Sequence, residues 1–296
     1  MDSEKMNEKI CIVSTVRSNK KTIEQWINYH LNIGVDKIFL FLDKRNKNIK
    51  GLINLKKKYG KKVSFFYSED HKSSIEIRQR KNSIKALKIA LNENFDWICH
   101  LDIDELIYFK EKMKNSLSKV SKKYDYIRLP TLEAVIEKEN YKNPFYEIKL
   151  FKNNFWKFSK IFFNAHIAGK SITRVKPYIM DLGIHQPNSN KKLKWTILPF
   201  NAYILHFYCV NFKDFLEKWR WRIDGSGVAR EMGKRGERIL SLIDKKLKKG
   251  KILELKDFYK KKFISPKKFN NLLTLLRVYK NIELNRKLFL WKNMTS

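Results

Sequence analysis

The sequence predicts an α/β fold with a mostly parallel central sheet and helices on both of its faces. Over the first hundred residues, short β-branched runs alternate with helical stretches, and the links between them are short. Hydrophobic residues make up 43% of the 296-residue chain, which is enough for a packed core. No apolar run approaches the roughly 18 residues of a membrane span.

The first hundred residues supply most of the predicted sheet. Strands are predicted at residues 9–16, 36–43, 62–67 and 97–102, and helices at 22–31, 47–59 and 73–94. Thr22 and Gln25 have the spacing of a capping box at the start of the first helix, and Gly60 is expected to end the second. Inward-facing apolar residues are expected at Ile23, Trp26 and Ile27 in the first helix, and at Ile77, Ile84, Leu87 and Leu91 in the third.

Beyond residue 120 the alternation loosens. Further strands are predicted at 124–132, 157–166, 171–176 and 202–208, followed by a helix at 214–222. From about residue 230 the chain is basic and helical, with apolar rows through Leu240, Ile243 and Leu247 and through Leu272, Leu273, Leu276 and Leu284. The division expected is a domain at residues 1–228 and a basic helical C-terminal extension at 229–296.

The net charge of +34 invites a nucleic-acid interpretation, because phosphate contacts dominate that kind of affinity. However, 51 of the 64 basic residues are lysine, and arginine is favoured for bidentate readout. The lysines are also scattered, so an anionic membrane surface or an anionic substrate fits equally well. The N-terminus lacks a secretory signal, and three distant cysteines are expected to be reduced. We therefore expect a cytoplasmic protein, peripheral on the membrane face.

The segment "DWICHLDIDELIYF" ends a hydrophobic strand in three carboxylates, Asp102, Asp104 and Glu105. On an extended strand end, Asp102 and Asp104 would point to the same side. Such hard oxygen ligands suit Mg²⁺ or Mn²⁺, which bind one or two carboxylates together with substrate phosphates. The alternative is a solvated acidic turn paired with lysines. In an open parallel sheet, ligands bind at the carboxyl ends of the strands, where this segment is predicted to lie.

Several blocks resemble the GT-A-fold nucleotide-sugar glycosyltransferases near families 2 and 92. These blocks are "VRSNKKTIEQWINYHLNIGVDKIFLFLD", "RQRKNSIKAL", "DWICHLDIDELIYF", "GKSITRV", "GIHQP" and "ILHFYCVNFKDFLEKW". They occur in the family order over roughly residues 9–222. The resemblance implies that Asp104 binds the divalent cation and that Asp102 contacts the ribose or shares the metal. Glu105 orients the pair or forms a salt bridge.

The resemblance also implies a donor site. Thr15, Arg17 and Asp43 would hold the nucleoside, although Arg17 replaces the Asn-Glu pair common at this place in the wider group. Arg80 and Lys81 would reach the diphosphate, or else lie on a solvated helical face.

Late histidines and acids complete the predicted site. His185 and His206 are candidates for a third metal ligand, because neutral imidazole ligates Mn²⁺. A hydrogen-bonded core role is the alternative for His206. An inverting enzyme needs a carboxylate base near the acceptor hydroxyl. Glu133 is the first candidate for it, and Asp224 or Asp214 the second.

The sequence thus indicates a glycosyltransferase of the hexosyltransferase type that depends on Mn²⁺ or Mg²⁺. It would move a sugar from a nucleotide donor, UDP-linked, to a glycan or lipid-linked glycan, with inversion. The C-terminal basic helices would lie against an anionic membrane or pack on the catalytic domain. Two other classes stay open: a nucleic-acid-binding protein or metal-dependent nuclease, with nucleic acid the less favoured partner, and a non-catalytic scaffold that keeps the fold.

Overall fold

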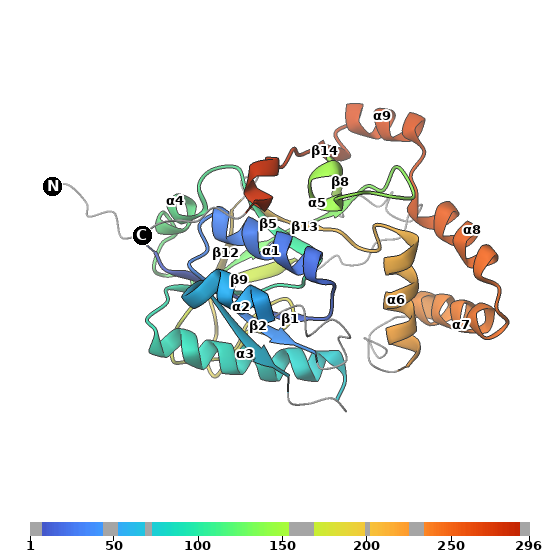
Figure 1. The fold of residues 1–296 in the computed structure, drawn as a ribbon. Helices are drawn as coiled ribbons and strands as arrows, with labels where there is room; N and C mark the ends of the chain where they lie inside the picture. The colour runs from blue at the N-terminus through green and yellow to red at the C-terminus, as the bar shows by residue number, and fades with distance from the viewer. Residues whose placement is uncertain are drawn as a thin grey trace.

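The computed structural model describes residues 8–43, 53–68, 73–153, 169–198, 202–224 and 234–290. Two sheets form the body of the molecule, and a group of helices from the C-terminal part stands to one side (Figure 1). The predicted strand at 157–166 and the beginning of the predicted helix at 47–59 lie outside the described residues. So does the predicted domain boundary at residue 228, which therefore stays a prediction.

The larger sheet has seven strands, and its first half is parallel as the sequence predicts. The strand order is β12-β6-β9-β4-β1-β2-β3. The parallel strands are β1 (Ile10–Val16), β2 (Lys37–Leu42), β3 (Val63–Tyr67) and β4 (Trp97–His100). The other half is mixed: β9 (Lys170–Arg174) runs antiparallel to β4 and to β6 (Tyr126–Leu129), and β12 (Trp195–Ile197) runs parallel to β6. The predicted α/β class is confirmed, with a sheet less parallel than expected.

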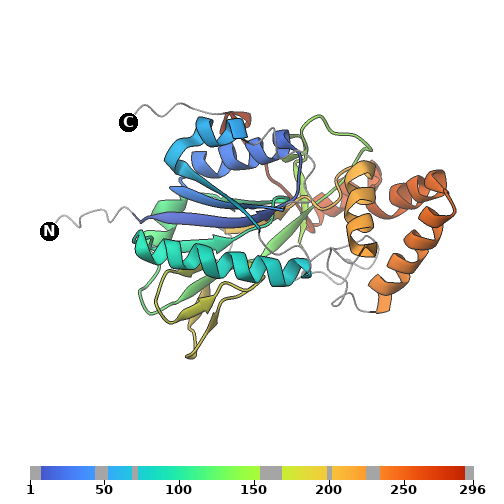
Figure 2. The same ribbon diagram turned by 60° about the horizontal axis from the view of Figure 1, so that its bottom comes forward.

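Helices cover both faces of this sheet (Figure 2). On one face, α1 (Lys20–Asn32) and α2 (Ile53–Tyr59) pack through residues such as Trp26 and Tyr59; on the other, α3 (Ile75–Asn92) packs through Ala86 and Leu87. Helix α1 begins two residues earlier than predicted, because the N-cap is Asn19, whose Oδ1 accepts a hydrogen bond from the Thr22 backbone N–H (3.0 Å). The predicted capping box at Thr22 is therefore wrong.

The inward face of α3 also differs from the prediction. Ile77 is 49% exposed, whereas the buried residues at the N-terminal end of the helix are polar: Arg78, Gln79 and Asn82. Leu87, by contrast, is buried as expected. Hydropathy alone favours an inward isoleucine, but this end of the helix lies beside polar groups at the strand ends, and it turns hydrogen-bonding side chains towards them.

A second sheet of five strands, in the order β14-β8-β7-β13-β5, adjoins the first. Its members are β5 (Glu105–Phe109), β7 (Thr131–Ala134), β8 (Leu150–Asn153), β13 (Ala202–His206) and β14 (Tyr279–Asn281). The predicted single strand at 124–132 is in fact two, because Pro130 separates β6 in the first sheet from β7 in the second. Proline has no backbone N–H for a ladder, so the chain changes sheet there.

The C-terminal helices pack partly on one another and partly on the second sheet. They are α6 (Phe212–Ile223), α7 (Lys234–Lys248), α8 (Ile252–Phe263) and α9 (Lys267–Leu275). Trp219 of α6, Ile243 of α7 and Tyr259 of α8 share one apolar cluster. The segment is not purely helical, because β14 completes the second sheet and Phe289 joins the main core. Other short elements are η2 (Gly60–Lys62), α4 (Met113–Ser118), α5 (Pro144–Glu147), β10 (Ile179–Asp181), β11 (Asn188–Ser189) and η4 (Arg286–Phe289).

Two further expectations concern cysteines and membrane spans. Cys11, Cys99 and Cys209 are buried and unpaired, as predicted. Within the described residues, none of the helices combines the length and apolarity required to cross a bilayer.

His30 in α1 makes the stability of the fold depend on pH. Its Nδ1 lies 2.8 Å from the Trp26 carbonyl, and its Nε2 accepts the Ile107 N–H at 3.3 Å, so the buried ring is neutral. Burial lowers the pKa of His30 from 6.5 to about 3. Between these values the unfolded chain binds a proton that the folded chain does not, so the contribution of His30 is complete above about pH 6.5 and is lost as the pH falls.

Urea unfolding between neutral and mildly acidic pH checks this prediction. Replacing His30 by glutamine should remove about 1.4 kcal/mol per pH unit from the acid-side slope of the unfolding free energy, whatever it does to stability at neutral pH. An unchanged slope would show that His30 is not the titrating group.

Candidate functional site

Three predicted polar groups meet at the carboxyl ends of the parallel strands, where α3 binds each of them. Thr15 belongs to β1, Asp43 follows β2, and Asp102 follows β4. The contacts are Asn82 Nδ2 to Thr15 Oγ1 at 2.9 Å, Arg78 Nη1 to Asp43 Oδ2 at 2.6 Å, and Gln79 Nε2 to Asp102 Oδ1 at 2.7 Å. The structure thus brings together the strand ends that sequence reasoning selected. It adds their partners on α3, which are Arg78, Gln79 and Asn82. The spacing of these polar residues, with Asn82 three and four positions after the other two, was the sequence signal that could have found them.

The acidic segment is a turn rather than an extended strand end. The Glu105 N–H donates to the Asp102 carbonyl at 3.1 Å, and the Asp102 N–H donates to Glu105 Oε2 at 2.9 Å. Glu105 opens β5 in the second sheet, so the turn joins the two sheets. As a consequence, Asp102 and Asp104 meet different lysines, and the expectation that they share one side of a strand is wrong.

Lys170, at the start of β9, neutralises Asp102 and Glu105. Its Nζ lies 2.7 Å from Asp102 Oδ2 and 3.3 Å from Glu105 Oε2, and the Lys170 and Glu105 side chains are almost fully buried. Burial would raise the pKa of Asp102, but the Lys170 ammonium outweighs it and lowers the pKa to about 2. For Glu105 burial prevails and, despite Lys170, raises the pKa to about 7. Asp102 is therefore ionised at neutral pH, and Glu105 is the structural member of the pair.

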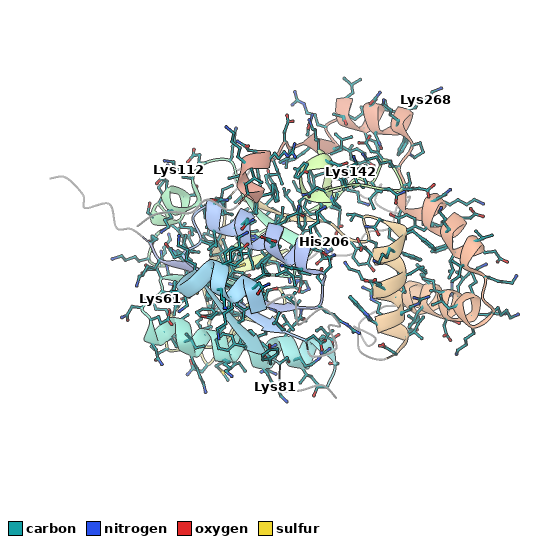
Figure 3. The ribbon with its side chains drawn as sticks, in the orientation of Figure 1. Lys61, Lys81, Lys112, Lys142, His206 and Lys268 are labelled. Atoms are coloured by element: carbon teal, nitrogen blue, oxygen red, sulfur yellow. The ribbon has the colours of Figure 1, made fainter. Side chains whose placement is uncertain are left out.

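Asp104 lies on the other side of the turn, against His206 and α6. His206 Nε2 is 3.4 Å from Asp104 Oδ2, and Lys218 of α6 forms an ion pair with the same oxygen. Burial opposes ionisation of Asp104, but Lys218 and His206 hold the pKa of that carboxyl well below its usual range. Figure 3 labels His206, which ends β13.

Glu133 binds the other nitrogen of His206. Its Oε1 lies 2.9 Å from His206 Nδ1, and both side chains are buried. The backbone explains the pairing, since Glu133 on β7 and His206 on β13 stand in register. Burial would lower the pKa of His206, but the two carboxylates, Glu133 first, raise it well above 6.5. The chain Asp104–His206–Glu133 is thus a histidine held between two carboxylates.

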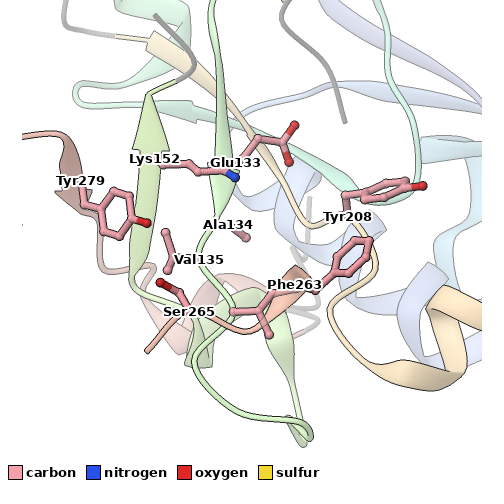
Figure 4. A pocket seen from close by; sticks show the side chains of 9 residues that line it. Glu133, Ala134, Val135, Lys152, Tyr208, Phe263, Ser265 and Tyr279 are labelled. Atoms are coloured by element: carbon pink, nitrogen blue, oxygen red, sulfur yellow. The ribbon is translucent and has the colours of Figure 1, made fainter. Parts of the chain in front are cut away.

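Glu133 also lines a small pocket (Figure 4). Lys152 of β8 stands opposite Glu133 in the β7–β8 ladder and turns its amine towards the carboxylate. Burial lowers the pKa of Lys152 to about 8, and Glu133 counteracts this. The remaining walls are Ala134, Val135, Ile136, Tyr208, Phe263, Ser265 and Tyr279. The C-terminal part of the chain therefore closes the rear of the site.

The other predicted donor-binding residues are more dispersed. The Arg17 guanidinium lies 4.2 Å from the centre of the Trp221 ring, a cation–π contact that joins the end of β1 to α6. Arg80 is 62% exposed and its Nε lies 3.0 Å from Asp181, and Lys81 is exposed as well. Both residues are on the outer face of α3, away from Gln79, which fits the solvated-face alternative.

The remaining candidates lie around the rim. His185 Nδ1 is 3.0 Å from the Gly169 carbonyl, beside Lys170 rather than beside Asp104. Asp214, in the first turn of α6, accepts from Asn211 in an N-capping arrangement, and burial raises its pKa. Asp224 is exposed and caps the C-terminus of α6.

The donor set at Asp104 and His206 suits a divalent cation. Within the described residues, no group of three or more His, Cys, Asp or Glu side chains is arranged to hold a metal ion. However, a carboxylate oxygen and an imidazole nitrogen face one another here, and the second imidazole nitrogen is bound by a carboxylate, as is usual for metal-ligating histidines. Mn²⁺ and Mg²⁺ commonly take further ligands from substrate phosphates and water. Asp104 and His206 would therefore fit such an ion as its two protein ligands once the ion displaces the proton that the two carboxylates favour on His206.

Comparison with known proteins identifies the family. Residues 9–251 match glycosyltransferase family 92. Two Arabidopsis thaliana proteins described as glycosyltransferase-like are 22% and 23% identical to the chain over 72% of its length. The match spans 49% and 56% of those proteins, so the chain covers about half their length.

Among solved structures, HddC from Yersinia pseudotuberculosis aligns with 71% of this chain and 97% of its own, at 13% identity and a TM-score of 0.37. That level of similarity says nothing about function. The family match, by contrast, covers most of the chain and includes Asp102, Asp104, Glu133, Lys170 and His206. The chain belongs to glycosyltransferase family 92.

Proposed function

We propose that this chain is a metal-dependent glycosyltransferase of the GT-A type. It transfers a sugar from a nucleotide donor, UDP-linked, to a glycan or lipid-linked glycan, with inversion. The observation that carries the proposal is the Asp104–His206–Glu133 chain beside the Asp102–Lys170 pair, at the strand edge where α/β folds bind ligands. Membership of family 92 supports transfer of a sugar in general.

The donor lies across the ends of β1, β2 and β4 in this proposal. Asp102 has a partly exposed, ionised carboxylate that Gln79 and Lys170 hold in place, which suits it to accept from ribose hydroxyls. Thr15 and Arg17 line the end of β1. Asp43 is 1% exposed and paired with Arg78. It therefore supports the donor site indirectly, by holding α3 against the end of β2.

Asp104 and His206 would hold Mn²⁺ or Mg²⁺. A bound divalent cation supplies Lewis-acid neutralisation of the charge that develops on the departing nucleoside diphosphate. Lys218, which forms an ion pair with Asp104, adds a second positive charge beside that carboxylate. Arg17, at the end of β1, adds another. His185 stands away from this pair, so we assign it no ligand role.

Glu133 orients His206 rather than meeting an acceptor. Its carboxylate is 4% exposed and bonded to His206 Nδ1, and a base needs to reach the acceptor hydroxyl. The Asp214 carboxylate accepts a hydrogen bond from the Nδ2 of Asn211, the N-cap of α6. Asp224 is exposed at the opposite end of that helix, so it becomes the proposed base.

Nucleotide-sugar hydrolysis tests the proposed function. The full chain should release nucleoside diphosphate from at least one member of a panel of UDP- and GDP-sugars when Mn²⁺ is present, and EDTA should stop the release. Turnover that is equal with and without the metal would reject metal dependence. No turnover of any donor, with or without a glycan acceptor, would reject the activity.

A further inference from the structure

Helix α9 turns an apolar face to the solvent. Leu272, Leu275 and Leu276 are 50%, 80% and 59% exposed. Their i, i+3, i+4 spacing places them on one side of the helix, the pattern that normally faces a core. Of the apolar row that the sequence indicates, Leu273 and Leu284 are buried, whereas Leu272 and Leu276 are exposed.

The rotation of α9 is fixed by its opposite side. Leu273 packs with Val278 and Tyr279. Asn270 is fully buried, donates to Glu137 Oε1 at 3.0 Å and also bonds to Ser265. A rotation of the helix that turned its leucines inward would break these contacts. Such a rotation is unfavourable, because a buried amide without partners is costly. The outward leucines are therefore a stable feature of the fold.

A basic rim flanks these leucines at the two ends of α9. Residues 258–282 contain seven lysines and arginines and no aspartate or glutamate. Lys267 and Lys268 are exposed at the start of α9, and Arg277 is exposed just after its end. Figure 3 labels Lys268 at the outer end of the helix, at the periphery of the molecule. The α9 face, defined as these three basic residues together with Leu272, Leu275 and Leu276, is both apolar and positively charged.

We propose that the α9 face docks onto an anionic lipid surface. The leucines enter the boundary between headgroups and acyl chains, and the basic residues stay at the level of the lipid phosphates. A second copy of the chain fits less well, because a symmetric contact through this face would bring the two basic rims together. The α9 face would thereby hold the protein flat on a membrane without crossing it.

The α9 face is connected to the catalytic sheet. Strand β14 follows α9 and pairs with β8, which pairs with β7, the strand of Glu133. Docking therefore fixes the direction in which this sheet edge faces the bilayer. Docking would also present a lipid-linked acceptor to the site. This consequence rests on the proposed function, whereas the docking proposal does not.

Vesicle co-sedimentation of the full chain, without nucleotide, tests the proposal. The test variant replaces Leu272, Leu275 and Leu276 by serine, and the matched control is Leu253→Ser, a 79%-exposed leucine at the start of α8. On vesicles of phosphatidylcholine with phosphatidylglycerol, the triple variant should bind about tenfold more weakly than the parent. The control should bind like the parent, and added NaCl should weaken both.

A second variant guards against misfolding. Lys267→Glu with Lys268→Glu keeps the leucines and should also lose binding to anionic vesicles, while circular dichroism and the melting temperature stay those of the parent. Parent-like binding by both variants would overturn the proposal. Equal binding of the parent to pure phosphatidylcholine vesicles would also overturn it. The proposal would be overturned as well if light scattering showed that the parent is a dimer and the triple leucine variant a monomer, while the two bind vesicles equally.

Discussion

Replacing Asp104 by asparagine should lower Mn²⁺-dependent turnover of a nucleotide sugar by about 100-fold or more. The substitution keeps the shape of the side chain but removes the anionic oxygen that faces His206 Nε2 and Lys218. The cation would then have one protein ligand instead of two. Steady-state release of nucleoside diphosphate across a range of Mn²⁺ concentrations checks this, because a lost ligand also raises the metal concentration needed for half-maximal rate.

The matched control is Asp244→Asn. Asp244 lies on α7 and pairs with exposed Lys248, far along the chain from the acidic turn. This variant should keep parent-like turnover and metal dependence. If Asp104→Asn keeps full activity at the same Mn²⁺ concentration while its melting temperature is normal, Asp104 is not a metal ligand.

Replacing Lys170 by methionine should destabilise the protein by about 3–5 kcal/mol. Methionine fills a similar volume, but it leaves Asp102 and Glu105 in a buried site without the cation that both contact. Urea unfolding at neutral pH measures the loss directly. An exposed pair supplies the control: Lys119→Met removes a 3.5 Å contact with Glu111 at the surface, and it should change the unfolding free energy by less than about 1 kcal/mol.

A second substitution separates charge from packing in this cluster. If the cost of Lys170→Met comes from uncompensated charge, adding Asp102→Asn should restore part of the lost stability, since Asp102 is the carboxylate that is ionised at neutral pH and loses its cation. A double variant that is less stable than either single variant would show instead that the lysine acts through its packing and hydrogen bonds. A loss below about 1 kcal/mol for Lys170→Met would contradict the assigned role.

The parts of the fold that local pattern determines could be predicted from the sequence. The β1 and β2 runs are rich in β-branched and aromatic residues and are buried except at Lys37, and α1 buries Ile23, Trp26 and Ile27 as its spacing indicates. The placement of Thr15, Asp43 and Asp102 at one edge follows from parallel alternation alone. Hence the class of fold and the clustering of these three residues needed no long-range information.

The partners of the acidic turn could not be predicted in the same way. Lys170 is 68 residues from Asp102, and Lys218 is 114 residues from Asp104, so only the placement of β9 and α6 brings them together. The Glu133–His206 pair likewise depends on the register between β7 and β13. The inward face of α3 was mispredicted for a related reason. Gln79 and Asn82 are buried because they bind Asp102 and Thr15 at the strand ends.

Ligand-induced thermal stabilisation of the unmodified chain tests the central claim most directly. UDP or GDP with Mn²⁺ should raise the melting temperature, because a ligand at 100 times its dissociation constant adds about 2.7 kcal/mol to the stability of the native state. The metal or the nucleotide alone should do less. If single-stranded or duplex nucleic acid stabilises the protein while neither nucleotide does, the strand-end site is not a nucleotide-sugar site and the glycosyltransferase account is contradicted.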